Sequence, residues 1–119
     1  MDVQISGRAK SLYQRDSAGI GCNTIVHEMS DLGATEQTHC MSVVIAVKRA
    51  LQKTLVPVKV NLASLGNMVA HVHWQVIPRF ADDPHFPQPV WGARQREGTA
   101  ARPGSDTLAL AIQSELRGL

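Results

Sequence analysis

The stretch HVHWQVIPR, residues 71–79, places two histidines and a glutamine at alternate positions. In an extended strand every second side chain lies on the same face, so His71, His73 and Gln75 would share one face. The apolar residues between them would then lie on the opposite face, toward a core. Imidazole rings act as nucleophiles, as general acids or bases and as metal ligands, so this face is a candidate chemical site.

The spacing alone leaves three interpretations open. The polar side chains can form the solvated face of an antiparallel sheet, with no chemical role. Two imidazoles that are two residues apart in a strand can share a zinc ion, although no third ligand is evident nearby. One imidazole can also act as a nucleophile or an acid–base group in catalysis.

A helix is predicted before this stretch, and a β-hairpin is predicted to include it. Apolar residues recur at steps of three and four between residues 34 and 55, which predicts an amphipathic helix with Gly33 or Thr35 as its N-cap. The alternation of valines after residue 55 predicts a strand over residues 56–62. A second strand is predicted over residues 69–77, with Gly66 and Asn67 at the tip of the hairpin.

The remaining segments suggest one domain with flanking regions. Residues 81–92 contain four prolines or glycines and are predicted to form a loop. A polar segment follows, and a terminal helix is expected to begin near Asp106. We therefore expect an atypical segment at residues 1–19, a core at residues 20–92, and a flexible segment with a C-terminal helix at residues 93–119.

Composition narrows the classes of function. The chain has 119 residues, 44% of them hydrophobic, and a formal net charge of +2, which is too small to indicate a nucleic-acid polymer or a membrane as partner. Cys22 and Cys40 form no metal or disulfide framework and are expected to be thiols in a reducing cytoplasm. Neither a secretory leader nor an apolar membrane span is expected.

The segment NLASLGNMVAHVHWQVIPRF resembles the histidine triad (HIT) family, whose signature is His-φ-His-φ-His-φ-φ, where φ is apolar. The Pro-Arg ending and the segment FADDPHFPQPVW are similar to one bacterial branch of that family, and the resemblance covers roughly residues 28–92. It implies an α+β fold with a mainly antiparallel sheet, one long helix and here a C-terminal helix. It also implies a homodimer that binds nucleotides and cleaves or transfers a nucleotidyl group.

The resemblance also implies roles for single residues. His73 matches the middle histidine, which attacks the α-phosphorus and holds a covalent nucleotidyl-imidazole. His71 would fix that ring or the phosphate, and backbone N–H groups around Gly66 and Asn67 would hold phosphate oxygens. Asn61 would face the site. The covalent step needs no metal cofactor.

Two features depart from the family pattern. Gln75 replaces the third histidine and cannot donate a titratable proton, although its amide can donate a hydrogen bond, which favours transfer or phosphorolysis over hydrolysis. Ile25 stands where an upstream histidine is expected, and residues 1–24 do not resemble the family's upstream strands; a shifted reading frame is one hypothesis. The alternative function is therefore a nucleotide-binding or interaction protein with lost or reduced catalysis.

Other residues are expected to be structural. Trp74 should lie in the core, and Trp91 should pack as part of a covering loop. Arg79 is expected in a surface ion pair or near a phosphate. Asp82 and Asp83 are interpreted as loop acids and not as metal ligands, because adjacent side chains point apart in extended backbone.

The predicted long helix suggests a homodimer. Residues 43–47 form an unbroken apolar run, so apolar groups occur around most of the helix circumference. A small domain would leave part of this surface uncovered, which is unfavourable for a soluble monomer. We therefore expect the helix and the strand over residues 56–62 to pair with their copies about a two-fold axis.

Overall fold

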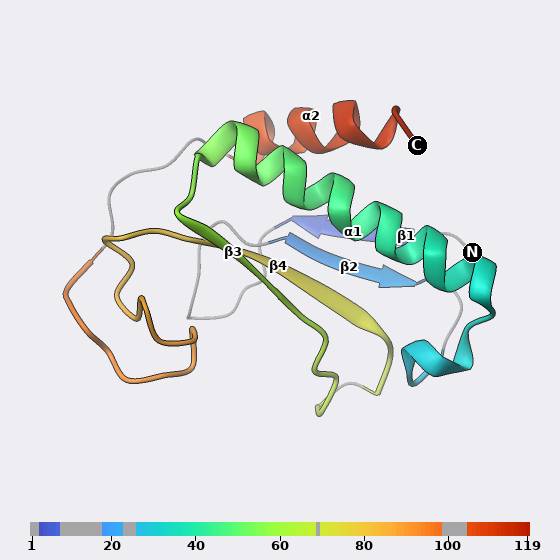
Figure 1. The fold of residues 1–119 in the computed structure, drawn as a ribbon, viewed down its shortest axis with the longest axis horizontal. Coiled ribbons are helices and arrows are strands. Elements are labelled where there is room, and N and C mark those ends of the chain that lie inside the picture. Colours follow the sequence, from blue (N-terminus) through green and yellow to red (C-terminus); the bar gives the residue numbers. More distant parts are fainter. Residues whose placement is uncertain (1–2, 8–17, 23–25, 69, 99–104) are drawn as a thin grey trace.

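The computed structural model describes residues 3–7, 18–22, 26–68, 70–98 and 105–119 (Figure 1). Its elements, in chain order, are β1 (Val3–Gly7), β2 (Ala18–Cys22), a short 3-10 helix η1 (Met29–Asp31), α1 (Ala34–Leu55), β3 (Lys59–Ala63), β4 (His73–Arg79) and α2 (Ser105–Leu116). The α+β class with one long helix and a C-terminal helix is thereby confirmed.

The strands form one antiparallel sheet in the order β1-β2-β4-β3. Two paired strands, β1 and β2, do precede α1, although residues 1–24 were not expected to resemble the family's upstream strands. The signal was weak because β2 has the sequence AGIGC, in which glycine and alanine carry little β-propensity. The reading-frame hypothesis for the first residues stays a prediction, to be tested on the nucleotide sequence.

Helix α1 has the predicted bounds, and Gly33 is its N-cap. Its last residue is Leu55. Val56 is the C-cap and has a φ of 48°, in the left-handed region, which stops the helix, and Pro57 follows. This turn delays β3 to Lys59, three residues later than predicted. No helix in the described part of the chain has the length and apolar character needed to cross a membrane.

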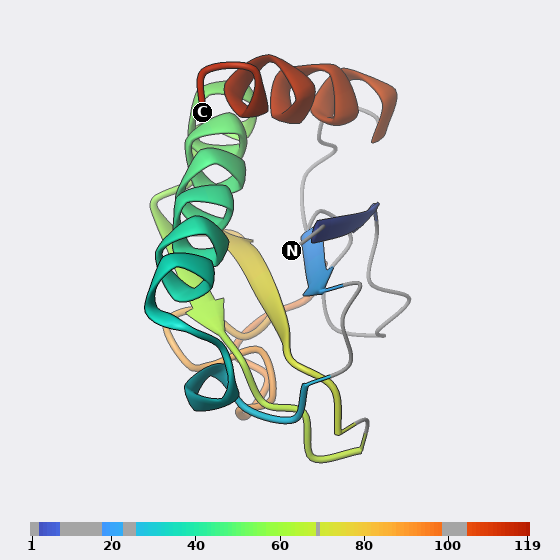
Figure 2. The same cartoon turned by 90° about the vertical axis from the view of Figure 1, so that its right-hand side faces the viewer.

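Both long helices lie on one face of the sheet (Figures 1 and 2). The core between the layers includes Ile20 from β2, Val44 and Leu51 from α1, Val76 from β4 and Ile112 from α2, which belong to one buried cluster. This layering leaves the other face of β3 and β4 for residues that are not needed in the core.

The expectation that residues 43–47 leave an uncovered apolar surface holds only for Ile45, which is partly exposed and lines an open surface pocket with Met41 and Leu119. Val43, Val44, Ala46 and Val47 are at most 4% exposed. They are covered because α1 packs against the sheet and also against α2, which lies across it (Figure 2). The homodimer stays a prediction, and the outer edge of β3, which has no strand beside it among the described residues, is a place where it could form.

Ile112 links α2 to the core, and its truncation tests this packing. The side chain is 7% exposed, so Ile112→Ala should lower the free energy of unfolding by about 2–4 kcal/mol, through lost burial and a residual cavity. Leu110 lies on the same helix but is 67% exposed, so Leu110→Ala should change it by no more than about 0.5 kcal/mol. Urea unfolding measures both, and equal effects would contradict the described position of α2.

Candidate functional site

His73 and Gln75 lie on the face of β4 that is turned away from the helices. In the strand register His73 is opposite Gly21, while Gln75 is opposite Gly19 of β2 and Ala63 of β3. Opposite residues in antiparallel strands share a face, so the two polar side chains are flanked by residues with little or no side chain. A Cβ added to Gly21 would meet no atom within 4 Å. Among the described residues, the sheet therefore has free space at Gly21, beside His73.

The imidazole of His73 is oriented by the backbone. Its Nδ1 lies 2.8 Å from the carbonyl oxygen of His71. A carbonyl oxygen can only accept a hydrogen bond, so Nδ1 carries the proton and Nε2 keeps its lone pair in the neutral ring. The arrangement thus selects the tautomer in which Nε2 is the nucleophilic or basic atom.

His71 itself precedes the strand, contrary to the predicted strand over residues 69–77. Strand β4 begins at His73 because the backbone N–H of Val72 donates to the carbonyl of Val26, 2.9 Å away, and not to β3. The side chain of His71 is half-buried. The carbonyl oxygen of His71 contacts Nδ1 of His73.

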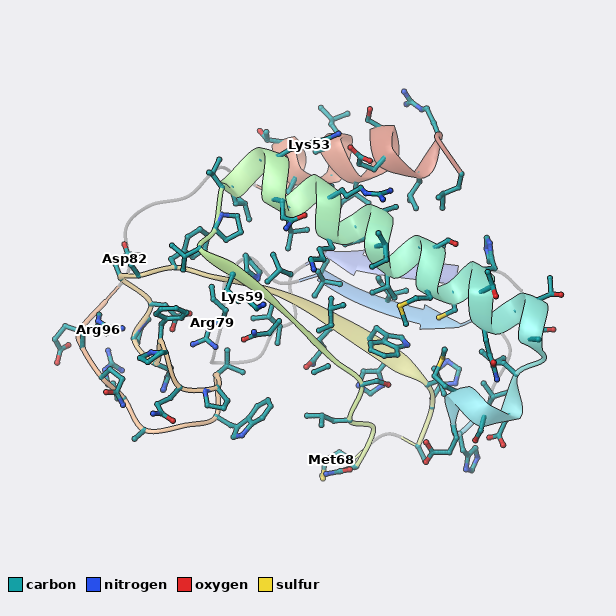
Figure 3. The ribbon with its side chains drawn as sticks, viewed as in Figure 1. Lys53, Lys59, Met68, Arg79, Asp82 and Arg96 are labelled. Atoms are coloured by element: carbon teal, nitrogen blue, oxygen red, sulfur yellow. The ribbon has the colours of Figure 1, made fainter. Side chains whose placement is uncertain are left out.

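The hairpin between β3 and β4 has Gly66 and Asn67 near its tip, as predicted. Gly66 has a φ of 66°, a conformation that favours glycine. Asn67 is exposed, and Met68 beside it is 96% exposed and extends away from the sheet (Figure 3). The tip lies at the end of the hairpin where β4 begins, which is also the end that carries His73. Contact between this turn and a phosphate stays a prediction.

Asn61 lies elsewhere on this face. It is opposite Ile77, four residues beyond His73, which corresponds to about 13 Å along the strand. Its Oδ1 accepts a hydrogen bond of 2.9 Å from Nη1 of Arg79. The structure therefore places Asn61 with Arg79 and not beside His73.

Arg79 is the centre of a buried polar network, so the expectation of a surface ion pair or a phosphate contact is wrong. The residue is 1% exposed, and its Nε donates to Oδ2 of Asp83 over 2.7 Å. Its Nη2 donates to the carbonyl oxygen of Gln88 over 2.6 Å. The guanidinium carbon lies 5.5 Å from the centre of the Phe86 ring, within cation–π range.

Asp83 is also buried, at 2% exposure, and does not behave as an ordinary loop acid. Burial by itself raises the pKa of this carboxyl group. The hydrogen bond and positive charge of Arg79, together with the backbone N–H groups of His85 and Phe86, outweigh burial and hold the pKa below its usual range. In the described part of the chain, no three His, Cys, Asp or Glu side chains are grouped so that they could hold a metal ion.

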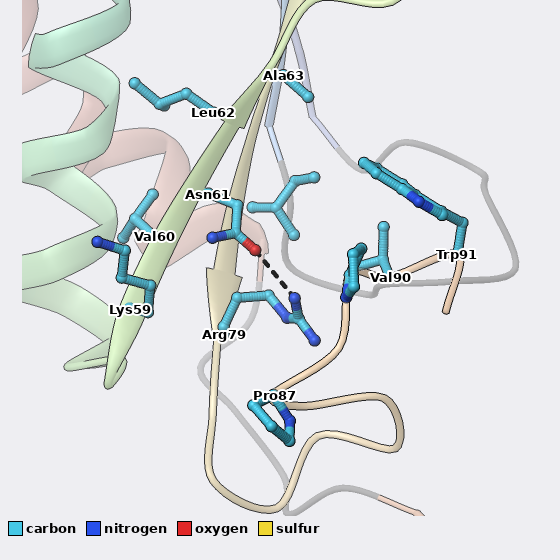
Figure 4. Close-up of a pocket in the computed structure, with 11 residues that line it drawn as sticks. Lys59, Val60, Asn61, Leu62, Ala63, Arg79, Pro87, Val90 and Trp91 are labelled. Atoms are coloured by element: carbon cyan, nitrogen blue, oxygen red, sulfur yellow. Dashed lines mark hydrogen bonds between the residues drawn. The ribbon is translucent and has the colours of Figure 1, made fainter. Parts of the chain in front are cut away.

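A pocket of about 440 Å³ lies beside this network, between β3, β4 and the loop over residues 87–91 (Figure 4). Trp91 lines it and is 62% exposed in the single chain, so the expected packing over the helix is wrong, while packing over a dimer seam stays a prediction. Trp74, by contrast, packs against the core cluster as predicted.

Several features of the site lay beyond the sequence prediction. The glycines of β2 were not predicted as part of the site. Their alternation in AGIGC puts both on one face of the strand, and this is the sequence signal that could have identified them. The pairing of Arg79 with Asp83 follows from the path of the loop and has no motif. Ile25 lies outside the described residues, and His27 is exposed.

The Arg79–Asp83 pair should dominate acid unfolding. Because the pKa of Asp83 is lowered from 3.8, its stabilisation is full above that value and is lost as the pH falls through the pKa of the folded state. Asp83→Asn leaves the Arg79 charge without its partner and should cost about 3–5 kcal/mol at pH 7. Urea unfolding from about pH 7 to about pH 2 should show this difference shrinking in acid. Asp106→Asn, at an exposed carboxylate of α2, is the control. A stability difference between Asp83→Asn and the unmodified protein that does not change with pH would contradict the role assigned to Asp83.

Comparison with known proteins agrees with this architecture. Residues 20–82 match the model of the HIT domain, which is just over half of the chain. A histidine triad protein from Bradyrhizobium japonicum has a similar crystal structure, with a TM-score of 0.65 and 27% identity over 86% of this chain and 74% of its own. Histidine triad proteins from Sinorhizobium meliloti and Marinobacter aquaeolei each give a TM-score of 0.65 and 25% identity, over 87% of this chain and 75% and 76% of theirs.

A search of curated proteins gave no significant match. The family assignment therefore rests on the domain model and on the solved structures. The chain belongs to the HIT domain family.

Proposed function

We propose that this protein binds a nucleoside phosphate derivative on the open face of β4 and that His73 attacks its α-phosphorus. The reaction is a hydrolysis or a nucleotidyl transfer through a nucleotidyl-histidine intermediate. Membership of the HIT family supports the substrate class. The observation that carries the chemistry is the 2.8 Å contact between Nδ1 of His73 and the carbonyl oxygen of His71.

That contact prepares the ring for nucleophilic attack. With the proton held on Nδ1, the lone pair on Nε2 is available without a separate base. When Nε2 bonds to phosphorus, the ring becomes positively charged, and the carbonyl oxygen accepts a stronger, charge-assisted hydrogen bond. The same interaction thus orients the free ring and stabilises the charged intermediate.

The small residues beside His73 support binding of a bulky ligand. Gly19 and Gly21 leave the β2 side of the face without side chains, and Ala63 leaves only a methyl group on the β3 side. A phosphate can therefore approach the strand closely. Backbone N–H groups of the turn at Gly66 and Asn67 are the proposed donors to its oxygens.

Both chemical steps balance without a cofactor. In the first, Nε2 of His73 forms a bond to the α-phosphorus, while the bond from phosphorus to the leaving-group oxygen or nitrogen breaks. The leaving group keeps that electron pair and takes a proton from solvent. In the second, an oxygen of water or phosphate bonds to phosphorus, the P–N bond breaks, and its electron pair returns to Nε2; an attacking water loses a proton to solvent.

Gln75 defines the kind of leaving group that suits this site. Its amide can donate a hydrogen bond to the departing atom but cannot transfer a proton. General acid help is worth about 10²- to 10⁴-fold, so leaving groups that need it should react slowly. Phosphate leaving groups and phosphate acceptors, which need less help, are therefore the preferred partners of the reaction.

Covalent labelling at His73 tests the proposal. Incubation with a radiolabelled dinucleoside polyphosphate or nucleoside phosphoramidate should give an acid-labile adduct that maps to His73 by mass spectrometry. His73→Asn should abolish the adduct, because an amide cannot act as the nucleophile. His85→Asn is the control, since His85 lies in the loop and its Nδ1 contacts the carbonyl oxygen of Gly92.

The same protein should be tested for nucleotide binding by calorimetry with AMP and GMP. Binding without adduct or turnover would reject catalysis and favour the alternative, a nucleotide-binding protein that has lost activity. Absence of both binding and labelling would reject the proposed function as a whole.

Filling the open face should block binding without unfolding the protein. A Cβ at Gly21 meets no atom within 4 Å, and valine suits an extended strand, so Gly21→Val should fold with near-native stability. Its two methyl groups would occupy the space beside His73 and should weaken nucleotide binding at least about tenfold, equivalent to about 1.4 kcal/mol. Gly98→Val, at an exposed loop glycine with similar free space, is the matched control. Unchanged binding in Gly21→Val would place the ligand elsewhere.

A further inference from the structure

Met68 has the most exposed large apolar side chain in the described part of the chain. The side chain is 96% exposed, at the tip of the hairpin between β3 and β4, and it extends away from the sheet (Figure 3). The other two methionines that the structure describes, Met29 and Met41, are half-buried, and Met41 packs against the core cluster. Of these three, Met68 therefore has the sulfur that a dissolved reagent reaches most easily.

Exposure decides how readily a thioether is oxidised. With hydrogen peroxide, a sulfur lone pair attacks one peroxide oxygen, the O–O bond breaks, and a proton moves to the departing oxygen, which leaves as water. Sulfur loses two electrons, the peroxide gains them, and methionine sulfoxide forms without another reactant. Because the peroxide must reach the sulfur from solvent, Met68 should react before Met29 and Met41.

The position of Met68 connects this chemistry to the candidate site. The residue directly follows Gly66 and Asn67, whose backbone N–H groups are the proposed donors to the substrate phosphate. The hairpin whose strands pair Ala63 with Gln75 leads through this turn to His73, the first residue of β4. A chemical change at Met68 therefore occurs beside the proposed phosphate donors.

The fold should tolerate oxidation at Met68. A side chain that is 96% exposed buries almost no apolar surface, so a sulfoxide there neither places an unpaired polar group in the core nor leaves a cavity. The same change at Met41 would place a polar oxygen against the core cluster. An effect of Met68 oxidation on binding would therefore be local and would not require unfolding.

Oxidation changes what this side chain can do at the turn. The thioether sulfur is only a weak hydrogen-bond acceptor, so it competes poorly for backbone N–H groups. The sulfoxide oxygen is a strong acceptor on a side chain with three rotatable bonds, which let it swing back to the turn. A backbone N–H group of Gly66 or Asn67 that donates to this oxygen is no longer available to a phosphate.

We propose that Met68 is a redox modification site, at which peroxide forms a sulfoxide that takes up N–H donors of the turn and weakens nucleotide binding. The inference rests on the proposed function, because the lost donors matter to binding only if the turn holds the phosphate. The change is reversible, since methionine sulfoxide reductases restore the thioether. In that step a dithiol is oxidised to a disulfide and the sulfoxide oxygen leaves as water.

Limited peroxide treatment with peptide mass mapping tests the site. The peptide that contains Met68 should gain one oxygen atom before the peptides that contain Met29 and Met41. The affinity of the oxidised protein for AMP, measured by calorimetry, should fall about two- to tenfold, the value of one net hydrogen bond. Reduction by the two methionine sulfoxide reductases with dithiothreitol should restore it.

Three variants assign the effect to one sulfur. Met68→Leu keeps an apolar side chain without sulfur, so it should bind AMP like the unmodified protein and keep its affinity after peroxide treatment. Met68→Gln carries a carbonyl acceptor on a side chain of similar length and should bind more weakly before any treatment. Met41→Leu is the matched control, which retains Met68 and should lose affinity with peroxide as the unmodified protein does.

A measurement without nucleotide separates this inference from the proposed function. In ¹⁵N spectra of the free protein, oxidation of Met68 should shift the amide signals of Gly66 and Asn67 and slow their exchange with solvent. Unchanged amide signals would overturn the inference, as would oxidation of Met29 and Met41 before Met68. Met68→Leu, treated in the same way, should show no shift.

The two failures give different results. If the unmodified protein binds AMP and oxidation of Met68 leaves the affinity unchanged, the redox site is overturned and the proposed function stands. If the protein binds no nucleotide in either state, the proposed function is rejected. Shifted amide signals would then still support the contact between the sulfoxide and the turn, and unshifted signals would reject that contact as well.

Discussion

The ion pair between Arg79 and Asp83 is the interaction on which the functional face depends. A buried charge is costly unless it is paired and its hydrogen bonds are satisfied. Here Nε, Nη1 and Nη2 of the guanidinium each donate, to Asp83, Asn61 and Gln88 respectively. Since these partners belong to the edge strand β3 and to the loop that follows β4, one side chain fixes the end of the hairpin and the loop together.

The two faces of the sheet differ in the volume of the side chains that they carry. On the helix side, Ile20 and Val76 fill the core beneath α1. On the other side, the cross-strand neighbours of His73 and Gln75 are glycine and alanine, so small residues flank the part-buried polar side chains. Period-two alternation allows one strand to satisfy both demands, because a core residue and a site residue can be adjacent in sequence and opposite in direction. The candidate site therefore costs the core nothing.

How much of this was readable from the sequence depends on whether the signal is local. Helix α1 was predicted at its observed bounds because its apolar spacing and the following proline lie within one segment. The face shared by His73 and Gln75 also follows from local alternation. The pairing of β2 with β4 could not be predicted, since AGIGC has weak β-propensity and its partner is more than fifty residues away in the chain. The burial of Asp83 and the exposure of Trp91 depend on the path of a proline-rich loop, for which no periodic pattern exists.

The orientation of His73 does not depend on which residue occupies position 75. This independence bears on which changes in the family motif the site can tolerate. The proton on Nδ1 of His73 is fixed by a backbone carbonyl, which every residue at position 71 would provide. In the proposed reaction, the attack on phosphorus therefore does not require a histidine at position 75, and Gln75 instead faces the departing atom. Replacing histidine by glutamine there removes a proton donor and leaves the nucleophile as it was, so the substitution changes which bonds can be broken more than whether the ring can attack.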